Sequence, residues 1–288
     1  MVNQNWRFLV TEERDAFFNM ALDEALFLLC LKEKLPPVLR LYQWEKTSVS
    51  FGYSQKINNT IDLNSCKNKG IDVVRRITGG RAVLHGDDLT YSLCSSEDYY
   101  DILGKNVMET YERISRAFIL VLKRFNIKGC WAKGVRKNFD EGENYDIKAP
   151  CFLSSSRYEI NVNGKKLIGS AQRRFKEGFI QQGSFLIKRG EVDLIDLLAD
   201  QNQKKTMKKI LKENSVTFEE LIGKGGHYPY LAWKALISLE ELAEATREGF
   251  EKYFKVKLEL KKLNRNEFEL AKKLAVEKYR SPDWSLRS

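Results

Sequence analysis

Apolar residues recur every three or four positions in two long stretches of this sequence. The first stretch predicts an amphipathic helix over residues 17–34, with Asp23 and Glu24 on its polar side and Pro36 just beyond its end. The second stretch predicts a helix over residues 105–126. A helix with one apolar side packs that side on a core, so both are expected to cover other elements.

Between and after these helices, runs rich in β-branched and aromatic residues predict strands. They cover residues 38–44, 47–53, 71–77, 82–84, 89–94, 157–162, 165–174 and 179–187. Asn163 and Gly164 separate two of these runs, and Asn-Gly is the preferred two-residue turn of a β-hairpin. In such a hairpin Lys166 lies opposite Asn161.

After residue 191 the helical period returns, in a part of the chain that is rich in lysine. The segments are 194–198, 207–211 and 239–254, followed by a short strand at 256–260 and a last helix at 267–279. The pattern therefore predicts an α+β (mixed α/β) catalytic domain over residues 1–190, with mixed sheets flanked by helices. A smaller, mainly helical C-terminal part covers residues 191–288.

Residues 129–150 have no clear period and many polar side chains. A long irregular segment of this kind is usually a surface loop, and such loops often belong to a binding site. We therefore expect this segment to lie beside the site.

Composition narrows the class of protein. Of the 288 residues 43% are hydrophobic and 31% are charged, and no apolar run approaches twenty residues. These values exclude a disordered chain and argue against a membrane span. The first ten residues lack a basic start followed by an apolar run, so no signal peptide is expected.

Cysteine and histidine usage limits the chemistry further. An odd number of cysteines without a CxxC pair fits neither a disulfide framework nor a zinc site, so we expect no metal and a reducing compartment. The five are Cys30, Cys66, Cys94, Cys130 and Cys151. Only His85 and His227 could serve as histidine bases.

The chain has a formal net charge of +10, and the excess is concentrated near its end. Residues 201–288 hold 19 Lys and Arg against 13 Asp and Glu. Five of these lysines recur at helical spacing: Lys204, Lys205, Lys208, Lys209 and Lys212. They form either a solvated helix face or a docking face for an acidic protein or a nucleic acid.

Residues 75–85 form the first candidate binding segment, a strand that ends in two arginines and a Gly-Gly turn. Adjacent glycines let the backbone approach a ligand closely, and arginines supply fixed positive charge. The alternative is an ordinary turn. The candidate ligand-binding residues here are Arg75, Arg76, Thr78, Gly79, Gly80, Arg81 and His85.

Gly169, Ser170 and Ala171 form the second candidate, because small side chains within a strand leave space for a ligand or another backbone. Tight packing of the sheet would explain them equally well. Lys165 and Lys166 precede them and must point to opposite faces, so only one of the two can face a pocket.

Cys151 is the third candidate. A lone cysteine beside an aromatic residue is more often a buried apolar side chain than a nucleophile. Cys151, however, ends the long polar segment instead of lying in an apolar period. A cationic neighbour such as Lys166 would lower the pKa of its thiol and favour the thiolate.

Taken in order, these motifs resemble the lipoate-protein ligase A and octanoyltransferase superfamily, with its biotin ligase-like catalytic domain. The chain is most similar to the LipM-type octanoyltransferases, and the likeness runs nearly end to end. It rests on Trp6-Arg7-Phe8, NMALDEAL at 19–26, Gly52-Tyr53-Ser54-Gln55, RRITGGRAVLH at 75–85, Leu89-Thr90-Tyr91-Ser92, Cys151-Phe152, Tyr158-Glu159, GKKLIGSAQRR at 164–174, Gln182-Gly183-Ser184 and KYRSPDW at 278–284.

The resemblance implies a cytoplasmic acyltransferase of lipoate biosynthesis. Octanoate would pass from acyl carrier protein to a lysine of a lipoyl-accepting protein, typically the glycine cleavage H protein. Cys151 would accept the acyl group as a thioester and Lys166 would be the active-site lysine, while residues 75–85 and 169–171 would shape the acyl pocket. The resemblance implies a monomer that needs no cofactor, since the acyl group arrives activated.

Other activities remain open on the sequence alone. An ATP-dependent lipoate-protein ligase of the same fold needs no cysteine at position 151, whereas an octanoyl amidotransferase between lipoyl domains also uses one. A further branch of octanoyltransferases places its cysteine after the strand that here carries Gln182-Gly183-Ser184, and no cysteine follows it in this chain. A nucleic-acid-binding protein is disfavoured, because the basic residues are not paired with exposed aromatics or a groove-reading helix.

Joining Cys151 to Lys166 sets a geometric condition. If residues 151–161 were straight, they would span roughly 33 Å at about 3.3 Å per residue, and the two side chains could not meet. We therefore expect Ser154, Ser155 and Ser156 to turn the chain so that Cys151 folds back over Lys166.

Overall fold

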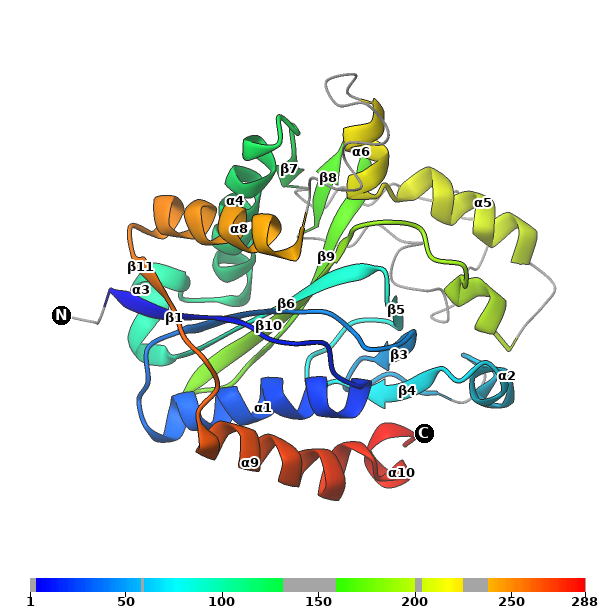
Figure 1. The fold of residues 1–288 in the computed structure, drawn as a ribbon, viewed down its shortest axis with the longest axis horizontal. Helices are drawn as coiled ribbons and strands as arrows, with labels where there is room; N and C mark the ends of the chain where they lie inside the picture. The colour runs from blue at the N-terminus through cyan, green and yellow to red at the C-terminus, as the bar shows by residue number, and fades with distance from the viewer. Residues whose placement is uncertain (1–3, 58–59, 132–158, 200–203, 225–237, 288) are drawn as a thin grey trace.

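A computed structural model describes residues 4–57, 60–131, 159–199, 204–224 and 238–287. Its centre is an eight-stranded mixed sheet that crosses the whole molecule (Figure 1). The strand order is β11 (Lys257–Leu260), β1 (Asn5–Val10), β2 (Val38–Tyr42), β6 (Asp88–Ser96), β10 (Gly178–Leu186), β9 (Lys165–Arg174), β8 (Ile160–Val162) and β7 (Cys130–Trp131). β1 runs parallel to both of its neighbours, and all the other pairs are antiparallel.

A smaller sheet lies beside one end of the large one. Its strands are β4 (Asp72–Arg75), β3 (Ser48–Phe51) and β5 (Val83–His85), in that order. They share a separate apolar core with α2 (Leu63–Asn68) and the 3₁₀ turn Leu194–Leu197. The turn 76–82 joins β4 to β5, and it meets the large sheet where Thr78 Oγ1 donates to Gln182 of β10 and Arg173 of β9 donates to the Ile77 carbonyl oxygen.

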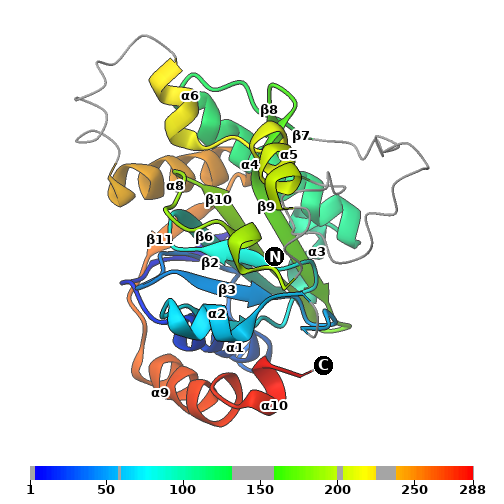
Figure 2. The same ribbon diagram turned by 90° about the vertical axis from the view of Figure 1, so that its right-hand side faces the viewer.

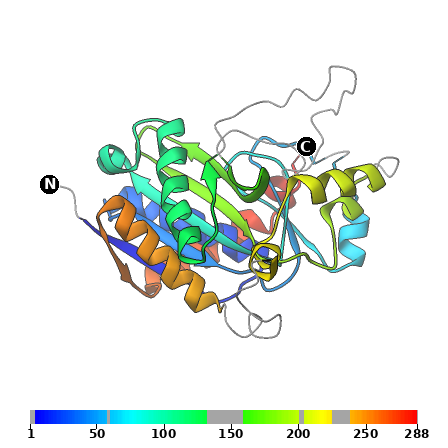
Figure 3. The same ribbon diagram turned by 90° about the horizontal axis from the view of Figure 1, so that it is seen from above.

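Helices cover both faces of the large sheet, as the view from the side shows (Figure 2). α4 (Val107–Arg124) and α8 (Leu239–Phe254) pack side by side on one face (Figure 3). The short α3 (Tyr100–Leu103) precedes α4 in the chain and contacts it. α1 (Ala16–Lys32) covers the other face, and α9 (Arg265–Leu274) packs on α1. A π-turn at Ala275–Tyr279 and α10 (Pro282–Ser285) complete the chain.

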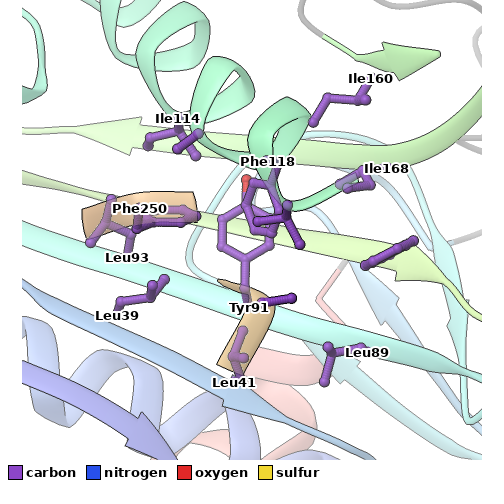
Figure 4. Packing of buried hydrophobic residues seen from close by; sticks show 14 of the residues in the cluster. Leu39, Leu41, Leu89, Tyr91, Leu93, Ile114, Phe118, Ile160, Ile168 and Phe250 are labelled. Atoms are coloured by element: carbon purple, nitrogen blue, oxygen red, sulfur yellow. The ribbon is translucent and has the colours of Figure 1, made fainter. Parts of the chain in front are cut away.

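The larger core lies between the sheet and the α4–α8 pair. Phe118 of α4 packs on Tyr91 of β6 with ring centres 4.6 Å apart, and Phe250 of α8 meets Phe118 edge-on at 5.1 Å (Figure 4). Aromatic pairs with this geometry contribute about 0.5–1.5 kcal/mol beyond the area they bury. They fix α4 and α8 on the sheet.

Two further helices lie between β10 and α8 in the sequence. α5 (Lys204–Asn214) carries the lysine run, and α6 (Phe218–Lys224) follows it. Figures 1 and 3 both place α5 at the end of the molecule where α2 lies. In the part of the chain that the structure describes, no helix has the length and apolar character needed to cross a membrane.

The sequence located most of these elements. The strand 165–174 and the helix 239–254 have the predicted bounds, and Asn163 and Gly164 form the turn with φ values of 52° and 76°. The expected pairing of Asn161 with Lys166 is confirmed. The short helices α2, α3 and α6 were not predicted, because four to seven residues show too little periodicity.

The prediction that α1 is amphipathic is wrong. The helix lies between the sheet and α9, so both of its sides are covered, and Asp23 is fully buried. Glu24 is partly buried beneath the C-terminal segment, where it accepts bonds from Lys278 Nζ and Tyr279 Oη. Sequence periodicity cannot show that a second helix from the far end of the chain covers the polar side.

Candidate active site

A cavity of about 390 Å³ lies between the α1 side of the large sheet and the smaller sheet. Its floor is a row of four residues that lie side by side on four adjacent strands. β9 contributes Gly169, β10 Ser184, β6 Thr90 and β2 Tyr42, and each pairs with the next. Three strand spacings of about 4.8 Å make this row roughly 14 Å long.

The opposite wall comes from the smaller sheet and the turn that joins its strands. It includes Ser50, Val83 and His85 from β3 and β5, and Arg76, Gly80 and Arg81 from the turn. Carbon atoms supply most of the cavity's surface. This volume and lining are typical of small-molecule sites, roughly 300–1,000 Å³, which combine an apolar wall with a few polar groups.

Gly80 shapes this wall by its backbone. Its φ is 89°, and a Cβ there would lie 2.8 Å from the Arg76 guanidinium and 3.4 Å from Ala171 Cβ. A Cβ on Gly52 would lie only 1.9 Å from the Gly80 carbonyl oxygen, so the two backbones touch. Any side chain at either position would push the turn into the cavity or away from it.

Arg76 holds the turn in place. It is buried and donates to the carbonyl oxygens of Gly79, Arg81 and Ser50, at 2.7–2.9 Å, and to Ser50 Oγ at 3.0 Å. A guanidinium has five donors in a fixed plane, which suits it to bracing a turn from within.

Arg75 points away from the cavity toward the end of the chain. Its guanidinium donates to the carbonyl oxygens of Gly52, Tyr53 and Gln55 and to two from the C-terminal segment, those of Trp284 and Arg287. Burial, with the charges of Arg287 and Arg76, lowers the pKa of Arg75 to about 10. Its place is beneath the turn, not at the cavity wall.

His85 connects the cavity to a buried carboxylate. Its Nε2 lies 2.8 Å from Ser50 Oγ, and its Nδ1 lies 2.8 Å from Asp88 Oδ2. Burial opposes the charge on Asp88, but His85 and bonds from Ser184 Oγ and Gly86 N–H hold the pKa of that carboxyl below its usual value. The ring also stacks on Trp44, with ring centres 4.0 Å apart, so its position is fixed.

Beside the floor, on the same side of the sheet, a second buried carboxylate joins three strands to α1. Asp23 accepts bonds from Arg40, Tyr42 and Ser92, and from Gln182 at 2.6 Å. Gln182 in turn accepts from Thr78 Oγ1 at 2.7 Å. Sequence reasoning missed this site. Arg40 in the middle of an apolar strand could have revealed it, since a buried arginine needs a carboxylate partner.

Ser170 has its hydroxyl on the other face of the sheet, 2.7 Å from Tyr91 Oη. A Cβ on Gly183, its partner on β10, would lie 2.2 Å from the Tyr91 ring. Burial raises the pKa of Tyr91 to about 12. Ser170 therefore borders the cavity while its hydroxyl anchors the α4 side of the floor.

A bulge in β9 sets the direction of Lys166. Ile168 pairs with Ile160 but Lys166 pairs with Asn161, so Leu167 is an extra residue on β9. Both Leu167 and Ile168 reach the core beneath α4. Because the bulge reverses the alternation, Lys166 lies on the cavity side of the sheet, where a regular strand would have pointed it into the α4 core.

There Lys166 forms a buried ion pair with Glu159, the residue just before β8. The N–H of Val216 donates to the Lys166 carbonyl oxygen at 2.9 Å. Cys151 and the expected turn at Ser154–Ser156 lie outside the described residues.

The structure thus brings most of the candidate residues together. Those that line the cavity are Arg76, Gly80, Arg81, His85, Gly169, Ser170 and Ala171. Arg75, Thr78 and Gly79 support the same turn from outside the cavity, and Lys166 lies three residues from Gly169 along β9. Within the described ranges, no three His, Cys, Asp or Glu side chains gather as metal ligands would.

Residues 15–225 match the lipoyl protein ligase A/B catalytic domain. The chain belongs to that family. Its curated relatives include the octanoyltransferase LipM of Brevibacillus brevis, 35% identical over 99% of both chains. The octanoyltransferase LipM of Geobacillus kaustophilus is 36% identical over the full length of both. That of Bacillus subtilis is 32% identical, also over both full lengths.

Solved structures of lipoyl protein ligases have the same fold. A bipartite lipoate protein ligase from Thermoplasma acidophilum, studied with its E2 lipoyl domain, superposes with a TM-score of 0.75 at 20% identity, covering 98% of this chain and 96% of that one. A lipoate-protein ligase A bound with ATP gives a TM-score of 0.71 at 21% identity, with 98% of both chains covered. The expected lipoate ligase-like α+β fold is confirmed.

Proposed function

We propose that this protein moves an octanoyl group from acyl carrier protein, through a thioester on Cys151, to a lysine of a lipoyl-accepting protein. Its activity as an octanoyltransferase of lipoate biosynthesis follows from end-to-end similarity to curated octanoyltransferases. The donor, the acceptor and the roles of individual residues are the proposal. The glycine cleavage H protein is the proposed acceptor, and the cytoplasm the proposed location.

The shape of the cavity is the observation that carries this proposal. An octanoyl chain has seven carbon–carbon bonds of about 1.5 Å and spans roughly 9 Å when extended. The row from Gly169 to Tyr42 is somewhat longer than that and runs across the strands. With its carbonyl end near Gly169 the chain would lie along the row, and its reacting carbon would be close to Lys166.

Two acyl transfers complete the reaction. The Cys151 thiolate attacks the donor thioester, and the carrier leaves as a thiolate that takes a proton from solvent. The acceptor lysine then attacks the new thioester through its neutral amine, an amide forms, the amine gives up a proton to solvent, and the Cys151 thiolate is released. Both bonds broken are thioesters, so the acyl group needs no ATP and no cofactor.

Lys166 would supply fixed positive charge at this centre. Beside the Glu159 carboxylate, its ammonium group would favour the thiolate and stabilise the oxyanion that forms on the acyl carbonyl oxygen. Neither histidine is needed as a base in this scheme.

Intact mass spectrometry tests the proposal directly. The protein is incubated with octanoyl-carrier protein without ATP, and an octanoyl adduct is expected in the wild type and absent in Cys151→Ala. Addition of the H protein should remove the adduct from the enzyme and add it to the H protein. Strict dependence on ATP and free acid, without an adduct, would contradict the transferase scheme and indicate a ligase.

A further inference from the structure

A second cavity of about 200 Å³ adjoins the first, in which we place the octanoyl chain, on the same side of the sheet. Three parts of the chain line it. Leu186 ends β10, Lys188 belongs to the segment that follows β10, and Leu211 belongs to α5. His85 lines both cavities and Asp88 borders the second. The His85 ring is therefore part of the wall that separates them.

The second cavity also adjoins the proposed reaction centre. Ser215, one of its lining residues, pairs with Lys166, and the next residue bonds the Lys166 carbonyl. A ligand in this cavity would thus approach Lys166 from one side, and an acyl chain in the first cavity would approach it from another.

The wall of the second cavity combines three kinds of group. Leu186 and Leu211 supply apolar surface, and Ser215 and Thr217 supply hydroxyls. Charged side chains are the third kind: Lys188 pairs with Asp87, Arg189 pairs with Glu220 and donates to Ser215 Oγ at 2.9 Å, and Asp88 and Asp193 add carboxylates. The apolar surface and the hydroxyls suit a flexible chain that has methyl groups and amides, whose terminal phosphodiester would lie outside these aspartates, toward the lysines of α5.

The rim beside this cavity is strongly basic. α5 has no buried side chain, although Leu211 reaches the cavity wall. Lys205, Lys209 and Lys212 lie one turn apart on its exposed side. A protein partner with an acidic surface would be attracted to this rim and held beside the cavity entrance.

We propose that the second cavity binds the phosphopantetheine arm of the acyl donor, and that α5 binds the acidic surface of its carrier. This inference rests on the proposed function, in which the donor is a carrier thioester. The arm would deliver the thioester to Lys166 while the octanoyl chain occupies the first cavity. The carrier would remain outside, on the lysines of α5.

Three donors separate the two parts of the proposal: octanoyl-carrier protein, octanoyl-pantetheine and octanoyl-thiophenol, which has no arm. Leu211→Trp should fill the second cavity. We expect it to raise KM at least tenfold for the carrier and for octanoyl-pantetheine and to leave octanoyl-thiophenol within about twofold. Thr217→Val, which keeps the shape but removes a hydroxyl, should raise KM a few-fold for the same two donors.

Lys205→Glu/Lys209→Glu tests the rim. This double variant should raise KM for octanoyl-carrier protein at least tenfold and make that KM less dependent on salt concentration. KM for the two small donors should stay unchanged. Lys257→Glu/Lys262→Glu is the matched control, because it makes the same change of charge beside β11 at the opposite edge of the sheet. It should behave as the wild type.

The outcomes are distinct. Equal losses for all three donors in Leu211→Trp, or no loss for any, would overturn the arm site. Equal effects of the two charge reversals would overturn the α5 surface. A KM of the wild type that is lower for octanoyl-pantetheine than for octanoyl-thiophenol would support the arm site. An absence of any Cys151 adduct with all donors would contradict the proposed function itself.

Discussion

Arg75 and Trp284 bind each other through a reciprocal pair of hydrogen bonds. The Trp284 indole N–H donates to the Arg75 carbonyl oxygen at 2.9 Å, and Arg75 Nε donates to the Trp284 carbonyl oxygen at 3.1 Å. The C-terminal α10 is thereby fixed to β4, directly before the turn that forms the cavity wall. Residues more than two hundred positions apart in sequence thus hold one structural unit together.

Trp284→Phe removes one of these bonds but keeps an aromatic ring. We expect it to lower the free energy of unfolding by about 1 kcal/mol, since that is the net value of one hydrogen bond. Urea denaturation would measure this change. Leu286→Ala, at an exposed position of the same segment, is the control and should alter stability by less than about 0.5 kcal/mol. Equal effects of the two substitutions would show that the bond to Arg75 is not what stabilises α10.

Asp23→Asn tests the buried carboxylate beside the cavity floor. Arg40 and Asp23 are both fully buried, and removing one member of a buried ion pair costs about 3–5 kcal/mol. We therefore expect a large loss of stability in urea denaturation. Asp101→Asn removes the exposed ion pair with Lys105 and should cost less than about 1 kcal/mol. If Asp23→Asn lost as little stability as Asp101→Asn, the structural role of Asp23 would be contradicted.

The sequence predicted the parts of this site that depend on local order. The hairpin at Asn163-Gly164, the strand that carries Gly169 and Ala171, and the Gly-Gly turn could all be located from residues a few positions apart. For the Asp23 site, Arg40 in an apolar strand indicates that a buried carboxylate is needed but not which one. The four donors to Asp23 come from three strands, and the helical period of residues 17–34 suggests that Asp23 faces solvent. The bulge at Leu167 was also out of reach, since it changes the face of Lys166 without any unusual residue type.

Lys165 and Lys166 offer a comparison within one strand. Lys166 lies buried on the cavity side beside Glu159, whereas Lys165 is more exposed and donates to the Lys212 carbonyl oxygen. We expect Lys166→Met to reduce the rate of Cys151 acylation at least a hundredfold, and Lys165→Met to leave it within about threefold. Rapid-quench measurement of the octanoyl adduct would give both rates. Equal rates in the two variants would remove Lys166 from the mechanism.

The stability of the protein in acid should depend on Asp88. The pKa of its carboxyl is lower in the folded protein than the value of about 3.9 for an unfolded chain. The unfolded state therefore binds a proton more readily, so this contribution to stability is present above about pH 4 and is lost as the pH falls through the folded pKa. Asp88→Asn should be less stable at pH 7 and should show a flatter decline below pH 4. Urea denaturation at both pH values would measure the difference, and parallel declines would contradict the assignment.

The Gly169 end of the cavity should hold the reacting end of every acyl chain. Ala171 borders the cavity there, two residues from Gly169 on β9. Ala171→Leu should therefore fill the space beside the acyl carbonyl, so kcat/KM should fall at least tenfold for octanoyl and butyryl donors alike. Separate acylation by octanoyl-pantetheine and by butyryl-pantetheine, with the adducts measured by mass, would give both values. If butyryl-pantetheine reacts as well as with the wild type, the acyl carbonyl does not lie near Gly169.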